Sequence, residues 1–523
     1  MKYAIINVVT TKIYNGKFQV AKINKTKHMK NKFVQVLFLG ILVLTGCKKD
    51  LTVANNNQPD FQKVYASGED LTNLTGGLFN TYYSGTHSYN GMQMFLATAA
   101  DNVTCSWGNQ AMRDMSWEPR KEWSNAPNYT YQGTTKYTFD KMYAVINTAS
   151  NIIKAVDGGV KVGVNGADNN MIKAVCRFNM GIAYGVLALN FDRAFIVDEK
   201  TTIPGAKLSD AKPYGEIGTA AIGYLTQALS LAGNTFTVSK DWFGTPADLS
   251  NTQLKAMINS MIARILSNMP RNSTELAAVN WASVKTYADA GISSDFMVIN
   301  DGYNKWYAEA GDYLTFPGWG LTDMYVVNQM DPQEPAHWDD LASFPAPPAS
   351  TNPNADKRLA SDFEYVPSVW LQATRGYYHW SNYRSKRYDG VYALGEGPLP
   401  EMLKAENDLY KAEARAYTGD LAGAAAIINA GTHTTRGGLP PVAADLNAIK
   451  AAIHAERHIE LYVSGMGLQF YEMRKRNLLQ KGTPLHLPLP AKTLETLAES
   501  LPFYTFGGVD KADGKNTSNA GWR

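Results

Sequence analysis

Two histidines and two glutamates lie close together near the C-terminal end of the sequence. His454 and His458 are four residues apart, with Glu456 between them and Glu460 after them. Residues four apart share one face of a helix, so two such imidazoles can chelate a metal ion. The order differs from the His-Glu-x-x-His pattern of zinc proteases. The spacing therefore favours a structural role for these groups, with a metal site as the lesser alternative.

Carboxyl groups are the other residues that suggest chemistry. Hydrolysis of a glycosidic bond needs two of them about 5–10 Å apart. The acidic residues of loop-like regions are Asp101, Asp323, Asp339, Asp340 and Glu364. Their spacing singles out no pair, and the sequence lacks the glycine motifs of hydrolases, nucleotide-binding loops and dinucleotide-binding folds. The sequence predicts no catalytic residue, no metal site and no cofactor, and leaves a structural Ca²⁺ open.

The tryptophans are distributed unevenly. All 11 lie beyond residue 100, and most of them fall in regions with little helical pattern, namely Trp107, Trp117, Trp123, Trp306, Trp319, Trp338, Trp370 and Trp380. Loops carry recognition residues more often than the elements they connect. Flat aromatic faces pack against the apolar faces of sugar rings, while Asn, Asp and Arg bind the hydroxyls. We therefore expect a ligand-binding face built from residues 101–125 and 300–385, although each ring has a competing role in the core.

Five residues are the best candidates for ligand contact. Trp107 and Asn109 follow the end of a predicted helix at Asp101. Trp319 stands between two glycines that give its ring little local cover, and Tyr378 and Trp380 flank a histidine. We expect these side chains to be exposed to solvent.

The N-terminal segment has the pattern of an export signal. Met29–Lys32 is basic and Phe33–Leu44 is apolar, which is typical of a secretory signal peptide. The 12 apolar residues are too few to span a membrane, which needs about 20. The segment ends in Leu44-Thr45-Gly46-Cys47, which resembles the lipobox of bacterial lipoproteins. We expect residues 1–46 to be a signal peptide with Met29 as the more natural start, Cys47 to be lipidated, and residues 47–60 to form a tether.

Cysteine and charge content limit the remaining function classes. With Cys47 lipidated, Cys105 and Cys176 remain, either as one disulfide or as two isolated thiols. The net charge of the whole chain is +3, but residues 1–46 hold eight Lys and no acid, which leaves 42 basic against 47 acidic residues. A positive field that would attract nucleic acid is therefore missing from the remainder.

Helical patterns occupy most of the chain and frame one irregular segment. The ranges with helical spacing of apolar residues are 61–83, 137–156, 171–191, 214–232, 254–269, 274–290, 402–417, 421–429 and 446–479. Residues 293–400 are rich in Pro and Gly, with short strand-like pieces such as Tyr365–Trp370. We divide the mature chain into an N-terminal helical region (61–292), a loop-rich binding subdomain (293–400) and a C-terminal helical region (401–523).

One helical pair shows how the scaffold is built. Leu409–Tyr417 and Leu421–Asn429 carry small residues on their facing sides and are joined by Thr418-Gly419-Asp420. This resembles a tetratricopeptide unit, with Gly419 at the helix end. Such a unit cannot bury its apolar face alone, so other pairs should stack beside it. The candidates are 171–191 with 214–232, and 254–269 with 274–290.

The C-terminal sequence carries a family resemblance. Glu456-Arg457-His458-Ile459-Glu460-Leu461 is followed by Gly465 and Gly467, then by Phe470–Arg476, and finally by Leu487-Pro488-Leu489-Pro490. This succession is similar to the closing signature of the SusD/RagB family of outer-membrane nutrient-binding lipoproteins. Residues 412–414, the helix start at Asn280 and the lipobox also match that family in position. The resemblance implies that Glu456, Arg457 and Glu460 are structural residues that pair with neighbouring helices.

The resemblance implies both a fold and a function. The implied fold is mostly α, a scaffold of tetratricopeptide-like helical pairs under a loop-rich, aromatic-rich ligand-binding subdomain. The implied protein is a lipid-anchored, non-enzymatic binder on the outer face of the outer membrane, which passes a glycan or peptide to a SusC-like TonB-dependent transporter. The alternatives are a periplasmic tetratricopeptide scaffold that binds protein and, less favoured, a glycoside hydrolase.

Overall fold

The computed structural model describes residues 64–104, 108–338, 348–368, 380–519 and 521–523. The export signal, Cys47, the tether, Cys105, Trp107 and Tyr378 lie outside these ranges, so the predictions made for them remain predictions. Asp60–Arg523 forms one compact unit by its internal contacts.

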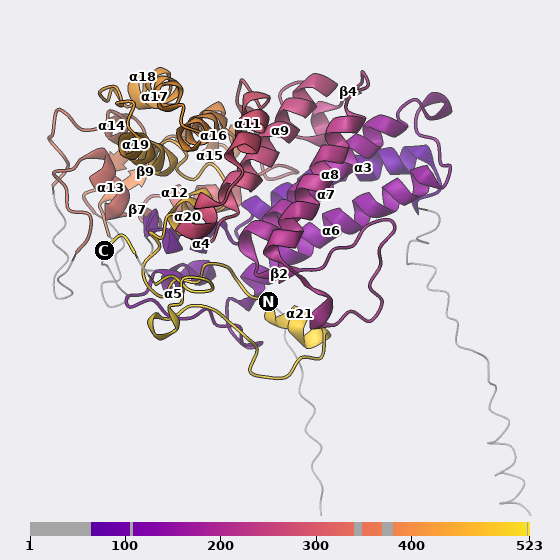
Figure 1. Cartoon of the computed structure of the whole chain (residues 1–523), viewed down its shortest axis with the longest axis horizontal. Coiled ribbons are helices and arrows are strands. Elements are labelled where there is room, and N and C mark those ends of the chain that lie inside the picture. The colour runs from indigo at the N-terminus through magenta and orange to yellow at the C-terminus, as the bar shows by residue number, and fades with distance from the viewer. Residues whose placement is uncertain (1–63, 105–107, 339–347, 369–379, 520) are drawn as a thin grey trace, which may run out of the picture. The chain divides into compact units, whose positions relative to one another are not determined.

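Helices make up most of the described chain, as the sequence predicts (Figure 1). The longer helices are α3 (Gly68–His87), α6 (Gln132–Asp157), α7 (Asn169–Asn190), α8 (Tyr214–Leu231), α9 (Asn251–Asn268), α11 (Trp281–Asp289), α16 (Lys404–Tyr417), α17 (Leu421–Ala430), α19 (Leu446–Ile459) and α20 (Leu468–Lys475). The shorter ones are α4 (Gln93–Ala99), α5 (Met112–Ser116), α10 (Ser273–Ala277), α12 (Glu309–Thr315), α13 (Met324–Met330), α14 (Arg358–Ser361), α15 (Asp389–Tyr392), α18 (Thr432–Thr435) and α21 (Ala491–Thr496).

Three predicted helix boundaries are wrong, each because a capping residue decides the end. The predicted helix 61–83 does not run unbroken through its described part: α3 begins at Gly68, because the Ser67 hydroxyl accepts from the Asp70 amide (3.1 Å). The range 274–290 is two helices, since Asn280 caps α11. The range 446–479 is also two helices, because the chain turns at Gly467, whose φ is +77°.

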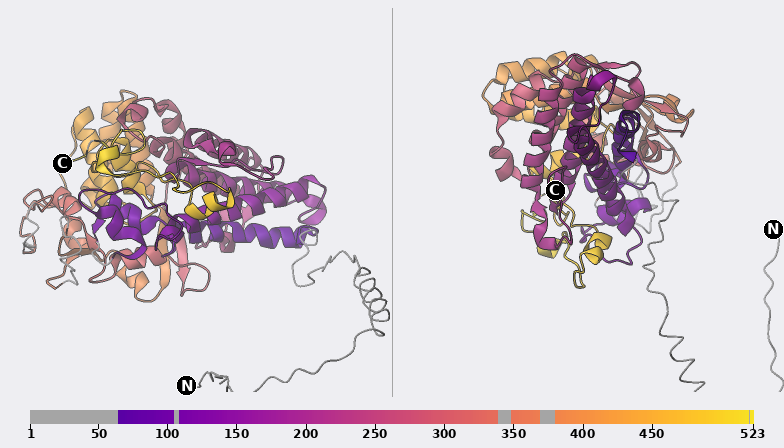
Figure 2. Two further views of the ribbon diagram at one scale, coloured as in Figure 1. Left: turned by 90° about the horizontal axis from the view of Figure 1, so that it is seen from below. Right: turned by 90° about the vertical axis from the view of Figure 1, so that its right-hand side faces the viewer.

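The helices pack in pairs that stack on one another. α7 packs against α8, α9 against α11, and α16 against α17, which are the pairs that the sequence predicts. Contacts of α8 with α9 and of α11 with α16 join the pairs into a continuous series (Figures 1 and 2). Gly419 ends α16 at φ +88°, and the Asp420 carboxylate accepts from the Gly423 amide (2.9 Å) to begin α17.

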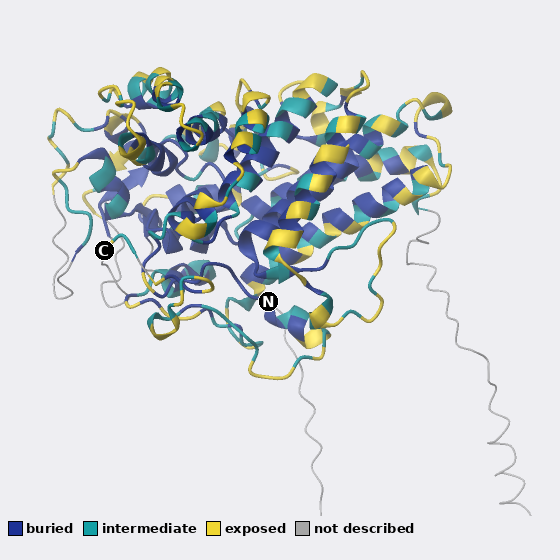
Figure 3. Ribbon diagram, viewed as in Figure 1, coloured by how far each residue is buried: buried dark blue, intermediate teal, exposed yellow. Residues whose placement is uncertain are grey.

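The centre of the main core is α7. Phe178, Met180 and Tyr184 have no exposed surface, and dark blue residues cover most of this helix in Figure 3. Among the described residues α7 is the one helix that is long and apolar enough to cross a membrane, and 94% of its apolar window is buried inside the protein. A helix that is apolar on all sides is expected at the centre of a bundle.

Short antiparallel ladders connect the irregular parts. The pairs are β6 (Phe296–Asp301) with β10 (Glu396–Met402), β1 (Val103–Thr104) with β7 (Leu321–Thr322), β8 (Phe363–Tyr365) with β9 (Tyr383–Ser385), β2 (Arg193–Ala194) with β3 (Lys212–Pro213), and β4 (Thr237–Val238) with β5 (Leu249–Ser250). The predicted strand-like piece Tyr365–Trp370 is wrong in its described part, because β8 ends at Tyr365 and residues 366–368 are not in a strand; Trp370 lies outside the described residues. A second core, which includes Met94 and Leu314, takes in Val103 of β1 and Phe363 of β8.

Candidate functional site

The ladder of β1 with β7 brings the two predicted parts of the binding face together. Val103 lies opposite Thr322 and Thr104 opposite Leu321. The Asp323 amide also donates to the Asn102 carbonyl (3.0 Å). The loop after Thr104 and the loop before Leu321 therefore leave the same edge, although more than 200 residues separate them in the sequence.

Aromatic rings and one amide gather where these loops meet. The Asn109 side chain donates a hydrogen bond to the Tyr313 hydroxyl. The Tyr313 ring packs edge-on against Trp319 (centroids 4.6 Å apart) and against Tyr89 (4.8 Å), and Phe316 lies 6.2 Å from Trp319. We call Tyr89, Asn109, Tyr313, Phe316 and Trp319 the Tyr313 cluster. It joins two of the five predicted contact residues, Asn109 and Trp319.

The backbone around the cluster is held in conformations that few residues adopt. Gln110 and Ala111 have φ of +47° and +64°, and the Thr134 hydroxyl donates to the Gln110 side chain (2.9 Å). Gly320 approaches the Leu314 carbonyl so closely that a Cβ would lie 2.4 Å from its oxygen. Strained backbone of this kind persists where the surroundings fix it, and it is frequent at ligand sites.

The cluster is open to solvent only in part. The Phe316 side chain is 48% exposed, whereas Tyr89, Asn109, Tyr313 and Trp319 are half-buried. Half-buried rings keep one edge or face for a ligand and are positioned by packing on the other. An amide beside them adds donor and acceptor groups. The arrangement suits a ligand that has both apolar faces and hydroxyl groups.

The prediction that Trp380 is an exposed contact residue is wrong. Its side chain has no exposed surface, and its carbonyl accepts from the indole of Trp338 (2.6 Å). The hydroxyl of the next residue, Ser381, donates a hydrogen bond to the carbonyl of Thr322 in β7 and so holds residues 380 and 381 against this strand. Asn382, which the sequence places beside it, is buried as well. Aromatic and polar residues in a loop-rich segment can thus serve its own core.

A second aromatic hollow lies in the same N-terminal loop. Arg113, Trp117, Lys121 and Tyr129 are among the residues that line a cavity of about 310 Å³. The Lys121 ammonium lies 4.4 Å from the Trp117 ring centre and the Arg113 guanidinium lies 5.8 Å from it. Since cations already contact this ring, Trp117 is a weaker platform for a neutral ligand than the Tyr313 cluster.

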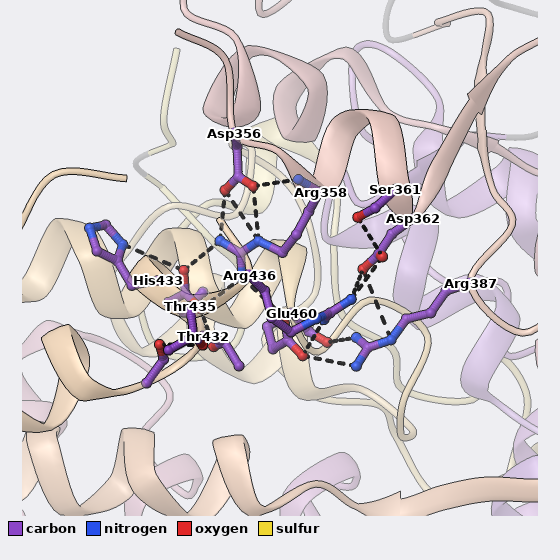
Figure 4. Close-up of polar contacts among 12 residues, drawn as sticks. Asp356, Arg358, Ser361, Asp362, Arg387, Thr432, His433, Thr435, Arg436 and Glu460 are labelled. Atoms are coloured by element: carbon purple, nitrogen blue, oxygen red, sulfur yellow. Dashed lines mark hydrogen bonds and ion pairs between the residues drawn. The ribbon is translucent and has the colours of Figure 1, made fainter. Parts of the chain in front are cut away.

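An ion network ties the loop-rich segment to the C-terminal helices (Figure 4). Arg358, with no exposed surface, pairs with Asp356 (2.7 Å), Glu456 (2.6 Å) and Glu460 (3.1 Å). Arg387 and Arg436 converge on Glu460 from two other elements, at 2.9 and 2.6 Å. Although burial raises it, contacts with His433 and Arg358 lower the pKa of Glu456 to about 2. This carboxyl group is therefore charged.

The other residues of the C-terminal signature are also paired inside the helical scaffold. Arg457 contacts Glu413 (2.6 Å) and Glu472 (2.5 Å), and the Lys475 ammonium lies between the same two carboxylates. These contacts and those of Glu456 and Glu460 confirm the predicted pairing with neighbouring helices. A substitution that leaves one such charge unpaired should be costly.

The histidine pair belongs to this buried scaffold. His454 contacts the Tyr325 hydroxyl (2.6 Å) and the Glu472 carboxylate (3.2 Å), so both of its ring nitrogens have partners. Burial, offset in part by Glu472, lowers the pKa of His454. His458 has no exposed surface and packs 4.6 Å from His454. Among the described residues no group of three or more His, Cys, Asp or Glu is placed to hold a metal ion.

The described candidate carboxylates hold the structure together. Asp101 and Asp323 are buried, and Asp101 pairs with Arg120 (2.5 Å). Burial and the charge of Asp101 raise the pKa of Asp323 well above its ordinary range. Glu364 pairs with Arg384 (2.5 Å). Asp101 and Asp323 stabilise the edge from which the binding loops leave, and solvent does not reach them.

Cys176 is a buried free thiol on α7. Burial raises its pKa to about 12, so the thiol is protonated near neutral pH.

Tyr313 and Tyr89 complete the cluster and are not among the contact residues predicted from the sequence. Tyr313 lies on α12, and Tyr89 lies two residues after the end of α3. The available signal was the run of aromatic residues from Tyr303 to Trp319, which contains six rings.

Known structures share this fold. A SusD superfamily protein from Parabacteroides distasonis aligns with 83% of this chain and 99% of its own, at a TM-score of 0.57 and 12% identity. A SusD superfamily protein from Bacteroides thetaiotaomicron aligns over 82% and 94%, at 0.56 and 14%. A SusD-like carbohydrate binding protein from Bacteroides vulgatus aligns over 78% and 84%, at 0.51 and 17%.

No family model and no curated protein matches the sequence. The likeness therefore lies in the fold. It confirms the architecture that the C-terminal signature implies: this chain has the fold of the SusD superfamily.

Proposed function

We propose that this protein binds oligosaccharides at the Tyr313 cluster and does not alter them. One observation carries the proposal: Asn109 and Trp319, from two distant loops, meet at Tyr313 in a partly open aromatic surface with an amide beside it. Aromatic faces and amide groups are the two kinds of contact that a sugar ring needs. The SusD-like carbohydrate binding protein of similar fold supports the same ligand class.

We further propose that the protein is a lipoprotein on the outer face of the outer membrane and delivers its ligand to a SusC-like TonB-dependent transporter. The lipobox-like sequence at Cys47 and the polar stretch after it support the anchor. The fold shared with SusD superfamily proteins supports the partner. Two or three acyl chains on one cysteine would hold the protein firmly at a membrane.

A glycan array tests the proposed ligand. The full chain, purified in detergent, should bind one or more classes of oligosaccharide, and Asn109→Ala should weaken that binding because it removes the amide. Trp117→Ala is the matched control, since it removes a half-buried aromatic outside the cluster. Equal binding by all three proteins would place the ligand elsewhere, and binding to no glycan would contradict the proposal.

Turnover and partner capture separate the alternatives. A bound glycan should remain intact by mass spectrometry after prolonged incubation, and a hydrolase would release reducing sugar. Mild extraction of the membrane should recover the protein with a large β-barrel transporter. Recovery from the soluble periplasmic fraction would favour the tetratricopeptide scaffold instead.

A further inference from the structure

One tyrosine outside the Tyr313 cluster is held in solvent in a strained conformation. Tyr303 is 64% exposed and has φ of +69°. A bulky residue in the left-handed region is a genuine outlier and strains the backbone. Burial of its ring does not account for this conformation, since most of the side chain faces water.

The loop that carries Tyr303 is fixed on several sides. The Asp301 carboxylate accepts from the amides of Lys305 and Trp306, both at 2.9 Å. The Lys305 ammonium donates to the Asp241 carbonyl (2.8 Å). On the other side Gly395, itself at φ +68°, lets the Tyr303 ring approach so closely that a Cβ there would lie 2.8 Å from the ring. The loop therefore holds this ring in place.

The ring borders a cleft with the chemistry of a sugar site. The cleft measures about 260 Å³ and is lined by Tyr83, Ser84, Ser88, Tyr303, Asn304, Lys305, Tyr307 and Glu309. The Tyr307 ring lies 3.9 Å from that of Tyr303, and its hydroxyl lies 3.1 Å from the Tyr303 hydroxyl. Two adjacent tyrosines are thus surrounded by hydroxyl, amide, ammonium and carboxylate groups.

The cleft and the Tyr313 cluster share a wall. The Glu309 carboxylate accepts from the Ser88 hydroxyl (3.1 Å) and from the Tyr89 amide (2.9 Å). The Tyr89 ring belongs to the cluster, and Tyr313 lies one turn after Glu309 on α12. α12 also packs against α3, whose Tyr83 and Ser84 line the cleft. The same helix α12 and the end of α3 therefore border both the cleft and the cluster.

We infer that this cleft is a second subsite, at which Tyr303 and Tyr307 bind sugar units of a chain whose other end occupies the Tyr313 cluster. The inference rests on the proposed function and specifies its ligand further, as an extended oligosaccharide. A second subsite would also explain the strained conformation of Tyr303, because this conformation holds the ring beside the path of the bound oligosaccharide.

Oligosaccharide series of increasing length test this inference. We would titrate the full chain by calorimetry with β-1,4-glucan, α-1,4-glucan, β-1,4-xylan and β-1,4-mannan fragments, from disaccharide to octasaccharide. The informative variant is Tyr303→Asn, because Asn is tolerated at positive φ, so the loop keeps its shape while the ring is lost. Tyr303→Phe retains the ring and is the matched control.

For the series that binds, the affinity of the wild type should rise with length beyond the shortest bound fragment. Tyr303→Asn should bind that shortest fragment like the wild type and lose about tenfold for the longest, with a melting temperature no lower than that of the wild type, whereas Tyr303→Phe should lose little affinity. If Tyr303→Asn matches the wild type at every length while Trp319→Ala does not, the second subsite is refuted and the cluster stands. If no series binds, the proposed function fails and the subsite with it.

Discussion

Two tryptophans in the same segment of this protein have different roles, one as a candidate ligand contact and the other in the core. Trp319 and Trp380 both lie in the loop-rich segment between 293 and 400, yet Trp319 is half-buried beside Tyr313 whereas Trp380 is enclosed. Residue type and local sequence could not distinguish them, because enclosure depends on Thr322 and Trp338, which pack on this stretch from other parts of the chain. Asn109 and Trp319 could be predicted as candidate contact residues from the sequence, but their shared contact with Tyr313 could not.

Loss of the Trp380 ring should therefore affect folding. Trp380→Ala leaves a cavity in a closed site and should lower the free energy of unfolding by about 3–5 kcal/mol. Chemical denaturation with tryptophan-independent detection, such as far-UV circular dichroism, measures it. Trp117→Ala serves as the control and should cost clearly less, since its site is half open. Equal losses for the two variants would mean that Trp380 is not enclosed.

One histidine in the ion network should make stability depend on pH. His433 donates from Nε2 to the Pro440 carbonyl (3.0 Å), and its Nδ1 lies 3.6 Å from the Glu456 carboxylate. Although burial lowers it, Glu456 and the Pro440 carbonyl raise the pKa of His433 above its usual value. Because the pKa of His433 is higher in the folded state, its protonation stabilises the fold. This stabilisation is complete below the ordinary histidine pKa of about 6.5 and is lost as the pH rises through the pKa of the folded state.

The melting temperature of wild type and His433→Gln, followed from pH 5 to pH 9, tests this titration. The difference between the two proteins should be largest at the acidic end and shrink as pH increases. Groups away from His433 titrate equally in both proteins, so they cancel in the difference, and Glu456, which still contacts Arg358, should stay charged over this pH range. A difference that stays constant across the range would show that His433 does not change its charge there.

At the scale of elements, helix type and pairing follow from sequence, whereas several ends do not. The pairing of α16 with α17 is visible from their small residues and from Gly419, because a positive φ at that turn favours glycine. The ends at Ser67, Asn280 and Gly467 depend on capping contacts that compete with a continuing apolar pattern. The short ladder of β1 with β7 leaves no periodic signal, since each strand has two residues.

The network around Arg358 should be essential for holding the loop-rich segment on α19. Arg358→Ala leaves Asp356, Glu456 and Glu460 short of a partner inside the protein, and we expect a loss of about 3–5 kcal/mol in the free energy of unfolding. Lys240→Ala breaks an exposed pair with Asp241 and should cost less than about 1 kcal/mol. Urea denaturation of both variants compares them. If Arg358→Ala is as stable as Lys240→Ala, the buried network does not hold these elements together.

At the scale of the whole molecule, the C-terminal signature was enough to predict the architecture that the SusD superfamily structures share. The placement of the ligand was harder to predict, because it arises from two loops joined by a ladder between distant residues. The scaffold and the binding surface thus differ in what determines them. Local periodicity specifies the first, and long-range contacts specify the second.

The proposed anchor makes a separate prediction for the whole chain. Cys47→Ala should remove the lipidation site and shift the protein from the membrane fraction to the soluble fraction, since α7 is buried in the core and offers no other attachment. Detergent phase partitioning after a high-salt wash measures this. Retention of the variant in the washed membranes would show that another contact holds the protein there.

The central claim is that the Tyr313 cluster is the ligand site, and calorimetry combined with thermal melting of Trp319→Ala tests it most directly. With the best ligand from the glycan array, we expect the variant to lose about 1–3 kcal/mol of binding free energy, as for other aromatic contact residues, and to melt near the wild-type temperature. The control Trp117→Ala should keep its affinity. If Trp319→Ala instead melts at a sharply lower temperature while its folded fraction binds like the wild type, Trp319 is a core residue and the account of the site is contradicted.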